Sequence, residues 1–204
     1  MTEAVDWQRW HEAYDEDSSL ARRLVVVQER ITELLDRARP GPIRVVSLCA
    51  GQGRDLLPVV TAHPRREHVH ARLVELDQRN VAAIPPLPNV EVVQGDAALL
   101  GAYEGAVPAD IVLACGVFGN ITAEDIRRTI EHLPMLCARG ASVIWTRGAS
   151  DPDLRPAIRG WFAGHGFEEE FFLAEPDSFG VGVHRFTGKP QPLDPAVKLF
   201  TFVR

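Results

Sequence analysis

The hydrophobic positions of this chain alternate between two spacings. Short runs rich in β-branched residues predict strands, and apolar residues three and four positions apart predict helices. The predicted strands are 43–49, 69–76, 90–93, 110–115, 142–146, 167–173 and 198–203, and the predicted helices are 18–39, 55–62, 80–84, 122–138 and 154–163. This alternation predicts an α/β fold: a doubly wound, Rossmann-like, mostly parallel seven-stranded sheet with an antiparallel last strand and helices on both faces.

Composition and charge narrow the function classes. The 204 residues are 46% hydrophobic and carry a formal net charge of −6, which argues against nucleic acid as a partner. The three cysteines lie far apart, so we predict reduced thiols and no metal site. No apolar run has membrane length and the first residues do not resemble a signal peptide, so we expect a cytoplasmic protein. We expect it to be a monomer or a homodimer.

A glycine turn follows the first predicted strand. Residues 43–49 lead into Ala50-Gly51-Gln52-Gly53, and an apolar helix start comes next. Glycines let the backbone approach a ligand closely, and the N–H groups of a first helical turn point into the same space. A plain strand–helix turn has the same pattern. Glu75, at the end of the second predicted strand, favours a ligand site because an acid about 20 residues beyond such a turn suits a ribose diol.

Chemically useful residues follow each of the first four predicted strands. They are the glycine turn, Glu75, Asp96 and the segment 116–118. In doubly wound sheets the carboxyl ends of the strands share one edge, and ligands bind there. The alternative is that all four sets of residues lie in loops by chance and have no common function. Their position at four strand ends that meet at one edge favours a small-molecule site.

Over residues 43–146 this pattern resembles the class I S-adenosylmethionine-dependent methyltransferases. The motifs that carry the resemblance are Ser47–Asp55, Val74–Asp77, Gln94–Ala97 and Asp110–Gly116. The resemblance implies methyl transfer from S-adenosylmethionine to a small molecule, leaving S-adenosylhomocysteine. It also implies three parts of one chain: a lid and helix in 1–40, a cofactor-binding core in 41–150, and C-terminal strands with a substrate-side loop in 151–204.

The resemblance implies a role for individual residues. The glycine loop would hold the methionine and ribose portions, Glu75 the ribose hydroxyls, and Asp96 with Ala97 the adenine. The implied cofactor-binding residues are Ala50, Gly51, Gln52, Gly53, Asp55, Glu75, Leu76, Asp96, Ala97, Cys115, Gly116 and Phe118. Two positions depart from the family pattern, since Ser47 replaces an acid and Cys49 a glycine. We expect Asp55 to supply the missing negative charge, and Cys49 to fit if its backbone is extended.

His184 and Tyr14 are the candidate catalytic residues, as a general base and as part of an N-terminal lid over the substrate. Packing alone would also account for either side chain. Two other function classes stay open. A non-catalytic S-adenosylmethionine-binding domain would have much the same sequence. A nicotinamide-dependent oxidoreductase is disfavoured by Leu56, which stands where that fingerprint has its third glycine.

Overall fold

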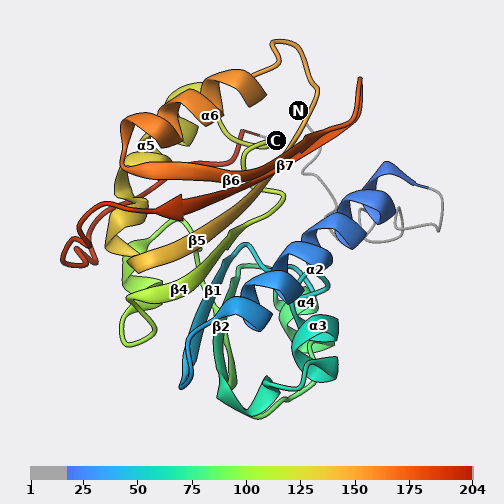
Figure 1. The fold of residues 1–204 in the computed structure, drawn as a ribbon, viewed down its shortest axis with the longest axis vertical. Coiled ribbons are helices and arrows are strands. Elements are labelled where there is room, and N and C mark those ends of the chain that lie inside the picture. The colour runs from blue at the N-terminus through green and yellow to red at the C-terminus, as the bar shows by residue number, and fades with distance from the viewer. Residues whose placement is uncertain (1–17, 204) are drawn as a thin grey trace.

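The computed structural model describes residues 18–203 as a seven-stranded sheet with helices on both faces (Figure 1). The strand order is β3-β2-β1-β4-β5-β7-β6, and β7 alone is antiparallel to its neighbours. The strands are β1 Ile43–Leu48, β2 Val69–Glu75, β3 Val90–Gln94, β4 Ala109–Ala114, β5 Cys137–Gly148, β6 Phe167–Ala174 and β7 Phe179–Phe186. The helices are α2 Ser19–Arg37, α3 Leu57–Ala62, α4 Gln78–Ala83, α5 Ala123–His132 and α6 Arg155–Gly164. The predicted fold class is confirmed.

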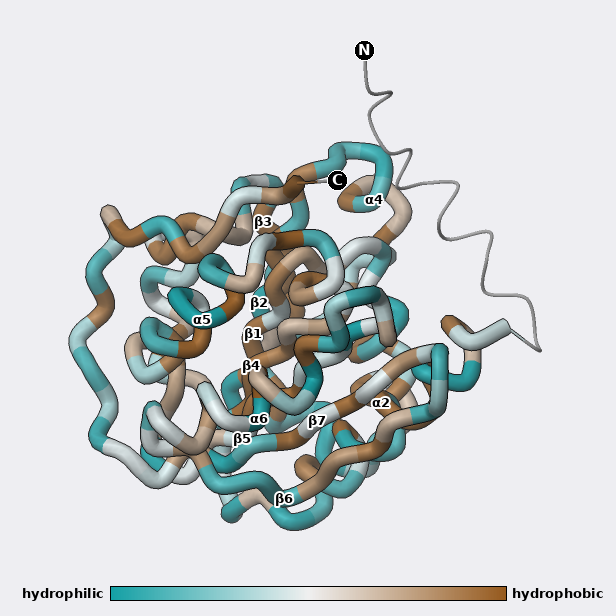
Figure 2. Tube along the Cα trace, turned by 90° about the horizontal axis from the view of Figure 1, so that it is seen from above, coloured by the Kyte–Doolittle hydropathy of each residue, from teal (hydrophilic) through white to brown (hydrophobic). Residues whose placement is uncertain are grey.

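Strands β1 and β4 form the centre of the sheet. They pair in parallel, with Val46 opposite Val112, and both of these residues are fully buried. Side chains on alternate faces of β1 belong to two separate apolar clusters, as expected for a parallel strand covered on both sides. Figure 2 shows these strands as apolar segments in the middle of the molecule, with polar positions gathered outside.

Each face of the sheet is covered by its own helices. Helices α2, α3 and α4 pack on one face, where Val27 and Ile31 of α2 are fully buried. Helices α5 and α6 pack on the other, where Ile130 and Phe162 are fully buried. Ser18 caps α2 by accepting a hydrogen bond from the Ala21 N–H at 3.0 Å. Within residues 18–203, no helix combines the length and the apolarity needed to cross a membrane.

The prediction of a last strand at 198–203 is wrong. The seventh strand is Phe179–Phe186, a run that its two internal glycines disguise, because glycine weakens strand propensity. Trp145 of β5 packs directly over this strand, and a Cβ on Gly182 would lie 2.4 Å from its indole ring. Any larger residue at position 182 would therefore collide with the indole ring of Trp145.

Residues 197–203 form what we call the C-terminal strap. The strap crosses the loops that follow β3 and β4, with the Val197 carbonyl accepting from the Leu100 N–H and the Leu199 N–H donating to the Ala98 carbonyl. Further along, the Val203 N–H donates to the Asn120 carbonyl. Isolated strand-type pairings join Leu99 to Lys198 and Ile121 to Phe202. The strap thus ties the end of the chain to the carboxyl edge of the sheet.

The helix predicted at 122–138 ends at His132. A turn of 3₁₀ helix, Leu133–Met135, follows it, and β5 begins at Cys137. Pro134 lies in that turn and has no N–H to continue the α-helical hydrogen bonds. Thr122 caps α5 as the sequence predicts, since its hydroxyl accepts from the Asp125 N–H at 3.1 Å.

Candidate functional site

A pocket of about 360 Å³ lies at the carboxyl ends of β1, β2, β3 and β4. It brings together most of the residues that the sequence places at a cofactor site. Those lining it are Ala50, Gly51, Asp55, Glu75, Leu76, Asp96, Ala97, Cys115 and Gly116. The remaining three, Gln52, Gly53 and Phe118, do not line it.

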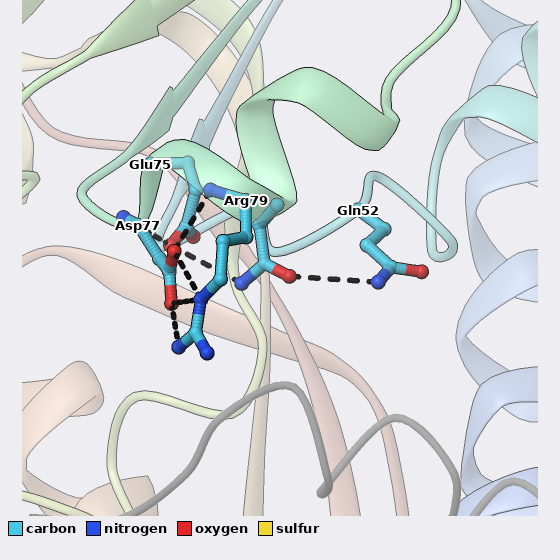
Figure 3. A network of polar contacts seen from close by, with 5 residues as sticks. Gln52, Glu75, Asp77 and Arg79 are labelled. Carbon is cyan, nitrogen blue, oxygen red and sulfur yellow. Dashed lines mark hydrogen bonds and ion pairs between the residues drawn. The ribbon is translucent and has the colours of Figure 1, made fainter.

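Glu75 is the central acceptor of the pocket. It is the last residue of β2 and only 8% exposed. One carboxylate oxygen accepts the Gly51 N–H at 2.7 Å. The other accepts the Asp77 N–H at 2.9 Å (Figure 3). The Asn80 amide adds a third donor at 3.5 Å. Because a carboxylate has about four acceptor positions, these donors fix the group and leave it capacity for a ligand hydroxyl.

Asp77 differs from Glu75 although both follow the same strand. Its carboxylate caps α4 by accepting from the Arg79 N–H at 2.8 Å, and it also pairs with the Arg79 guanidinium at 2.7 Å. These hydrogen bonds hold the pKa of the Asp77 carboxyl below its usual range. Asp77 also lines the pocket, but its carboxylate is engaged by the start of α4 and by Arg79, so Glu75 is the acid at this strand end with acceptor capacity left for a ligand.

Gln52 and Gly53 contribute to the conformation of the glycine loop without lining the pocket. Gly53 has φ +72°, and a Cβ there would lie 2.6 Å from the Leu57 side chain at the start of α3. The Gln52 amide donates to the Asn80 side chain at 3.5 Å (Figure 3). The Gln52 oxygen accepts from the Arg54 guanidinium at 3.1 Å. Both residues set the path of the loop, and Ala50 and Gly51 face the ligand space.

The condition set for Cys49, an extended backbone, is not met. Its φ of +51° is left-handed, a conformation that costs a non-glycine residue about 1–2 kcal/mol. The thiol lines the pocket, and burial together with the Glu75 and Asp96 carboxylates raises its pKa, so it stays protonated. Ser47, the other departure from the family pattern, is buried within β1.

Arg23, Asp55 and Cys115 form the second polar group of the pocket. Burial raises the pKa of the Asp55 carboxyl, and the Arg23 charge and a hydrogen bond with the Cys115 thiol oppose that rise. The Cys115 pKa is raised well above its usual value by burial and by the Asp55 charge. Sequence reasoning missed Arg23, although it lies on the apolar stripe of α2, four and eight residues before Val27 and Ile31.

The third part of the pocket combines Asp96 with apolar side chains. One Asp96 oxygen accepts the Ala98 N–H at 2.9 Å, and the other lies 3.7 Å from the Lys198 ammonium. Leu76 and Phe202 line the same pocket. Phe202 was not expected there, because no local pattern connects the end of the chain with the loops after β3 and β4.

Phe118 does not lie at the site predicted for it. Its ring is fully buried against Trp145, with the ring centroids 6.0 Å apart, and its carbonyl accepts from the Arg147 guanidinium. The side chain therefore does not line the pocket at which the sequence places it. Cys115 and Gly116 before it do line the pocket.

His184, the candidate general base, does not line the pocket either. His184 lies inside β7 opposite Val143, whereas the β7 residue at the carboxyl end of β5 is Phe179. The ring is 1% exposed, its Nδ1 accepts from the Trp145 indole N–H at 3.1 Å, and burial lowers its pKa to about 4. Tyr14, the other catalytic candidate, lies outside the described residues.

No family model matches the sequence, and no curated protein matches it either. Solved structures do match. Magnesium protoporphyrin IX methyltransferase from Synechocystis, with S-adenosylhomocysteine bound, is similar at TM-score 0.67 and 13% identity over 88% of this chain and 93% of that one. An O-methyltransferase family protein from Burkholderia thailandensis is similar at TM-score 0.64 and 18% identity over 83% of this chain, which spans 57% of that protein's length.

A third similar structure is a Burkholderia thailandensis 1,6-didemethyltoxoflavin N1-methyltransferase with 1,6-didemethyltoxoflavin and S-adenosylhomocysteine bound. Its TM-score is 0.57 at 14% identity, over 81% of this chain and 78% of that chain. These likenesses show that the chain has the fold of the class I S-adenosylmethionine-dependent methyltransferases.

Proposed function

We propose that this protein is an S-adenosylmethionine-dependent methyltransferase of the cytoplasm that acts on a small molecule. The observation that carries the proposal is the Glu75 carboxylate, fixed by the Gly51 and Asp77 N–H groups at the wall of a 360 Å³ pocket. The acceptor position that these donors leave open suits a ligand hydroxyl, such as one hydroxyl of a ribose diol.

The pocket offers a partner for each portion of the cofactor. Glu75 would hold the ribose hydroxyls, and Asp96 the exocyclic amino group of the base. Arg23 and Asp55, of opposite charge, would meet the carboxylate and ammonium of the methionine end. Once bound, the cofactor supplies a methyl group on a sulfonium, and the residues of this chain orient it for an in-line displacement.

A small-molecule acceptor is supported by charge and by similar structures. The net charge of −6 opposes binding to a phosphate backbone. Two of the similar structures are named for methylating magnesium protoporphyrin IX and 1,6-didemethyltoxoflavin. Both are compact organic molecules, and the proposal extends this class of acceptor to the present chain.

A non-catalytic domain that binds the same cofactor is the second candidate. The observation that favours it is that no histidine, lysine or tyrosine is among the described residues lining the pocket. A base is needed only when the acceptor must lose a proton, so this composition also fits an enzyme with a readily methylated acceptor. Methyl transfer to any small molecule from labelled S-adenosylmethionine separates the two.

Calorimetry with S-adenosylhomocysteine tests the proposal, with NADH as the competing ligand. We expect S-adenosylhomocysteine to bind and NADH not to bind. Glu75→Ala should weaken S-adenosylhomocysteine by about 1–3 kcal/mol, the scale for leaving a buried polar group without its partner. Glu91→Ala is the matched control, since Glu91 lies on neighbouring β3 and pairs with Arg72 outside the pocket.

Glu75→Gln covers the case in which the alanine variant folds poorly, since it keeps the shape and removes the charge. Thermal unfolding of each variant without ligand shows whether the fold is intact. Binding of NADH in place of S-adenosylhomocysteine, or unchanged affinity in both folded Glu75 variants, contradicts the proposed function.

A further inference from the structure

The C-terminal strap reaches the wall of the proposed cofactor pocket. Its backbone is bonded at both ends, through Leu199 to the Ala98 carbonyl and through Val203 to the Asn120 carbonyl. Between these bonds the Thr201 N–H donates to the Asp125 carboxylate at 3.2 Å. The strap is therefore held against the loops after β3 and β4 along most of its length.

Two phenylalanines of the strap have different surroundings. Phe200 is 2% exposed and belongs to the core cluster under α5 and α6. Phe202 is 39% exposed and lines the pocket, with its ring centroid 5.4 Å from that of Phe200 in an edge-on arrangement. Phe200 thus anchors the strap, and Phe202 contributes partly exposed apolar surface to the pocket wall.

The strap runs beside the part of the pocket where the base is placed. Lys198 lies 3.7 Å from the Asp96 carboxylate, and Leu199 bonds to Ala98. Leu76, 67% exposed, lines the pocket along with Phe202. Two large apolar side chains with exposed surface in one pocket are typical of a site for a flat, partly apolar ligand, because its binding removes both surfaces from water.

We propose that Phe202 contacts the adenine of the cofactor and that the C-terminal strap is part of the base-binding site. This inference rests on the proposed function, because it takes the Asp96 side of the pocket as the base side. An aromatic ring against a nucleobase contributes about 1–3 kcal/mol by alanine substitution, which corresponds to about 5- to 150-fold in affinity. The last residues of the chain would then determine cofactor affinity from outside the motifs at the strand ends.

Calorimetry with two ligands tests where Phe202 acts. Adenosine carries the base and ribose, and S-adenosylhomocysteine adds the amino-acid end. Phe202→Ala should weaken both by a similar factor of about tenfold. Val203→Ala, which changes the exposed neighbour of Phe202, should leave both within twofold. Phe202→Leu keeps an apolar side chain without a ring, and its affinity should lie between those of wild type and Phe202→Ala.

The outcomes separate this inference from the proposed function. If wild type fails to bind S-adenosylhomocysteine, both are wrong. If wild type binds it and Phe202→Ala leaves the affinity within twofold, the strap inference alone is wrong. A loss confined to S-adenosylhomocysteine, with adenosine unchanged, also overturns the inference, because the contact would then lie at the amino-acid end. Thermal unfolding without ligand identifies any loss of fold, and Phe202→Leu then carries the test.

Discussion

Glu75 and His184 are both titratable side chains buried in strands of the same sheet, at 8% and 1% exposure. Their surroundings differ. Glu75 ends its strand beside a pocket and is held by backbone N–H groups. His184 lies within its strand, stacked on Phe162 with ring centroids 4.3 Å apart, and accepts from the Trp145 indole.

The comparison shows that burial alone does not mark a functional group. The Glu75 carboxylate has acceptor capacity and space in front of it, so it can take a ligand. The His184 ring packs against the aromatic rings of Trp145 and Phe162, and burial lowers its pKa to about 4, so it is neutral near pH 7. It does not line the pocket that Glu75 faces. A buried titratable group becomes a candidate site when a cavity adjoins it.

The largest expected effect is the loss of stability in Phe162→Ala, which should occur without a loss of ligand binding. Phe162 is fully buried and its ring contacts those of Trp145, Phe167 and His184. Phe162→Ala should lower the free energy of unfolding by about 3–5 kcal/mol, the range for truncating a buried aromatic. Urea denaturation measures this, and calorimetry under native conditions should give unchanged affinity for S-adenosylhomocysteine.

Leu76→Ala should have the opposite effect to Phe162→Ala: it should weaken ligand binding and leave stability nearly unchanged. Leu76 is 67% exposed and lines the pocket, so we expect its truncation to change stability by less than about 0.5 kcal/mol. Its affinity for S-adenosylhomocysteine should nevertheless fall. If Phe162→Ala weakens binding as strongly as Leu76→Ala, the two regions are coupled and the distinction fails.

The pH dependence of stability gives the next effect. The pKa of His184 is lowered from 6.5 to about 4 on folding, mainly by burial, with the Arg159 charge in the same direction and Glu169 opposing it. Between these two values the unfolded chain binds the extra proton, so this contribution to stability is complete above pH 6.5 and is lost as pH falls toward 4. From pH 7 to 4.5 the loss due to His184 should be about 2–3 kcal/mol.

Urea denaturation at pH 7, 5.5 and 4.5 measures that loss in wild type and in His184→Gln. Other carboxyl groups titrate in both proteins, so the difference between the two pH profiles reports His184. We expect the glutamine variant to be less stable at pH 7 and to lose less stability on acidification. Parallel profiles would show that the histidine is protonated or exposed in the folded protein.

The fold was predictable from the sequence because its central strands are continuous apolar runs that end in turn residues. Val45 and Val46 of β1 and the equivalent run in β4 are buried on both faces, and few other structures accept such runs. The seventh strand was not predictable by the same means. Its glycines make room for Trp145, a requirement that arises only when β5 and β7 are side by side.

The site was predictable where it depends on strand ends. Gly51, Glu75 and Asp96 each follow a recognisable strand, and parallel strands bring their ends together. Arg23 lies on α2, which precedes the sheet in the sequence. Phe202 lies in the C-terminal strap. Their positions depend on how α2 and the strap pack, which no local pattern records.

The smallest expected effect on stability comes from backbone strain at Cys49 beside the pocket. His184 has no such left-handed backbone. Cys49 has a left-handed backbone, which costs about 1–2 kcal/mol and which glycine adopts freely. Glycine also makes the unfolded chain more flexible, which offsets about 0.5–1 kcal/mol of the gain. Cys49→Gly should therefore raise the free energy of unfolding by about 0.5–1 kcal/mol in urea denaturation.

Cys137→Gly is the matched control: Cys137 is fully buried in β5 without a left-handed backbone, so the same exchange should cost about 1–2 kcal/mol. Equal losses at both cysteines would mean that the Cys49 side chain contributes more by packing than its backbone costs in strain.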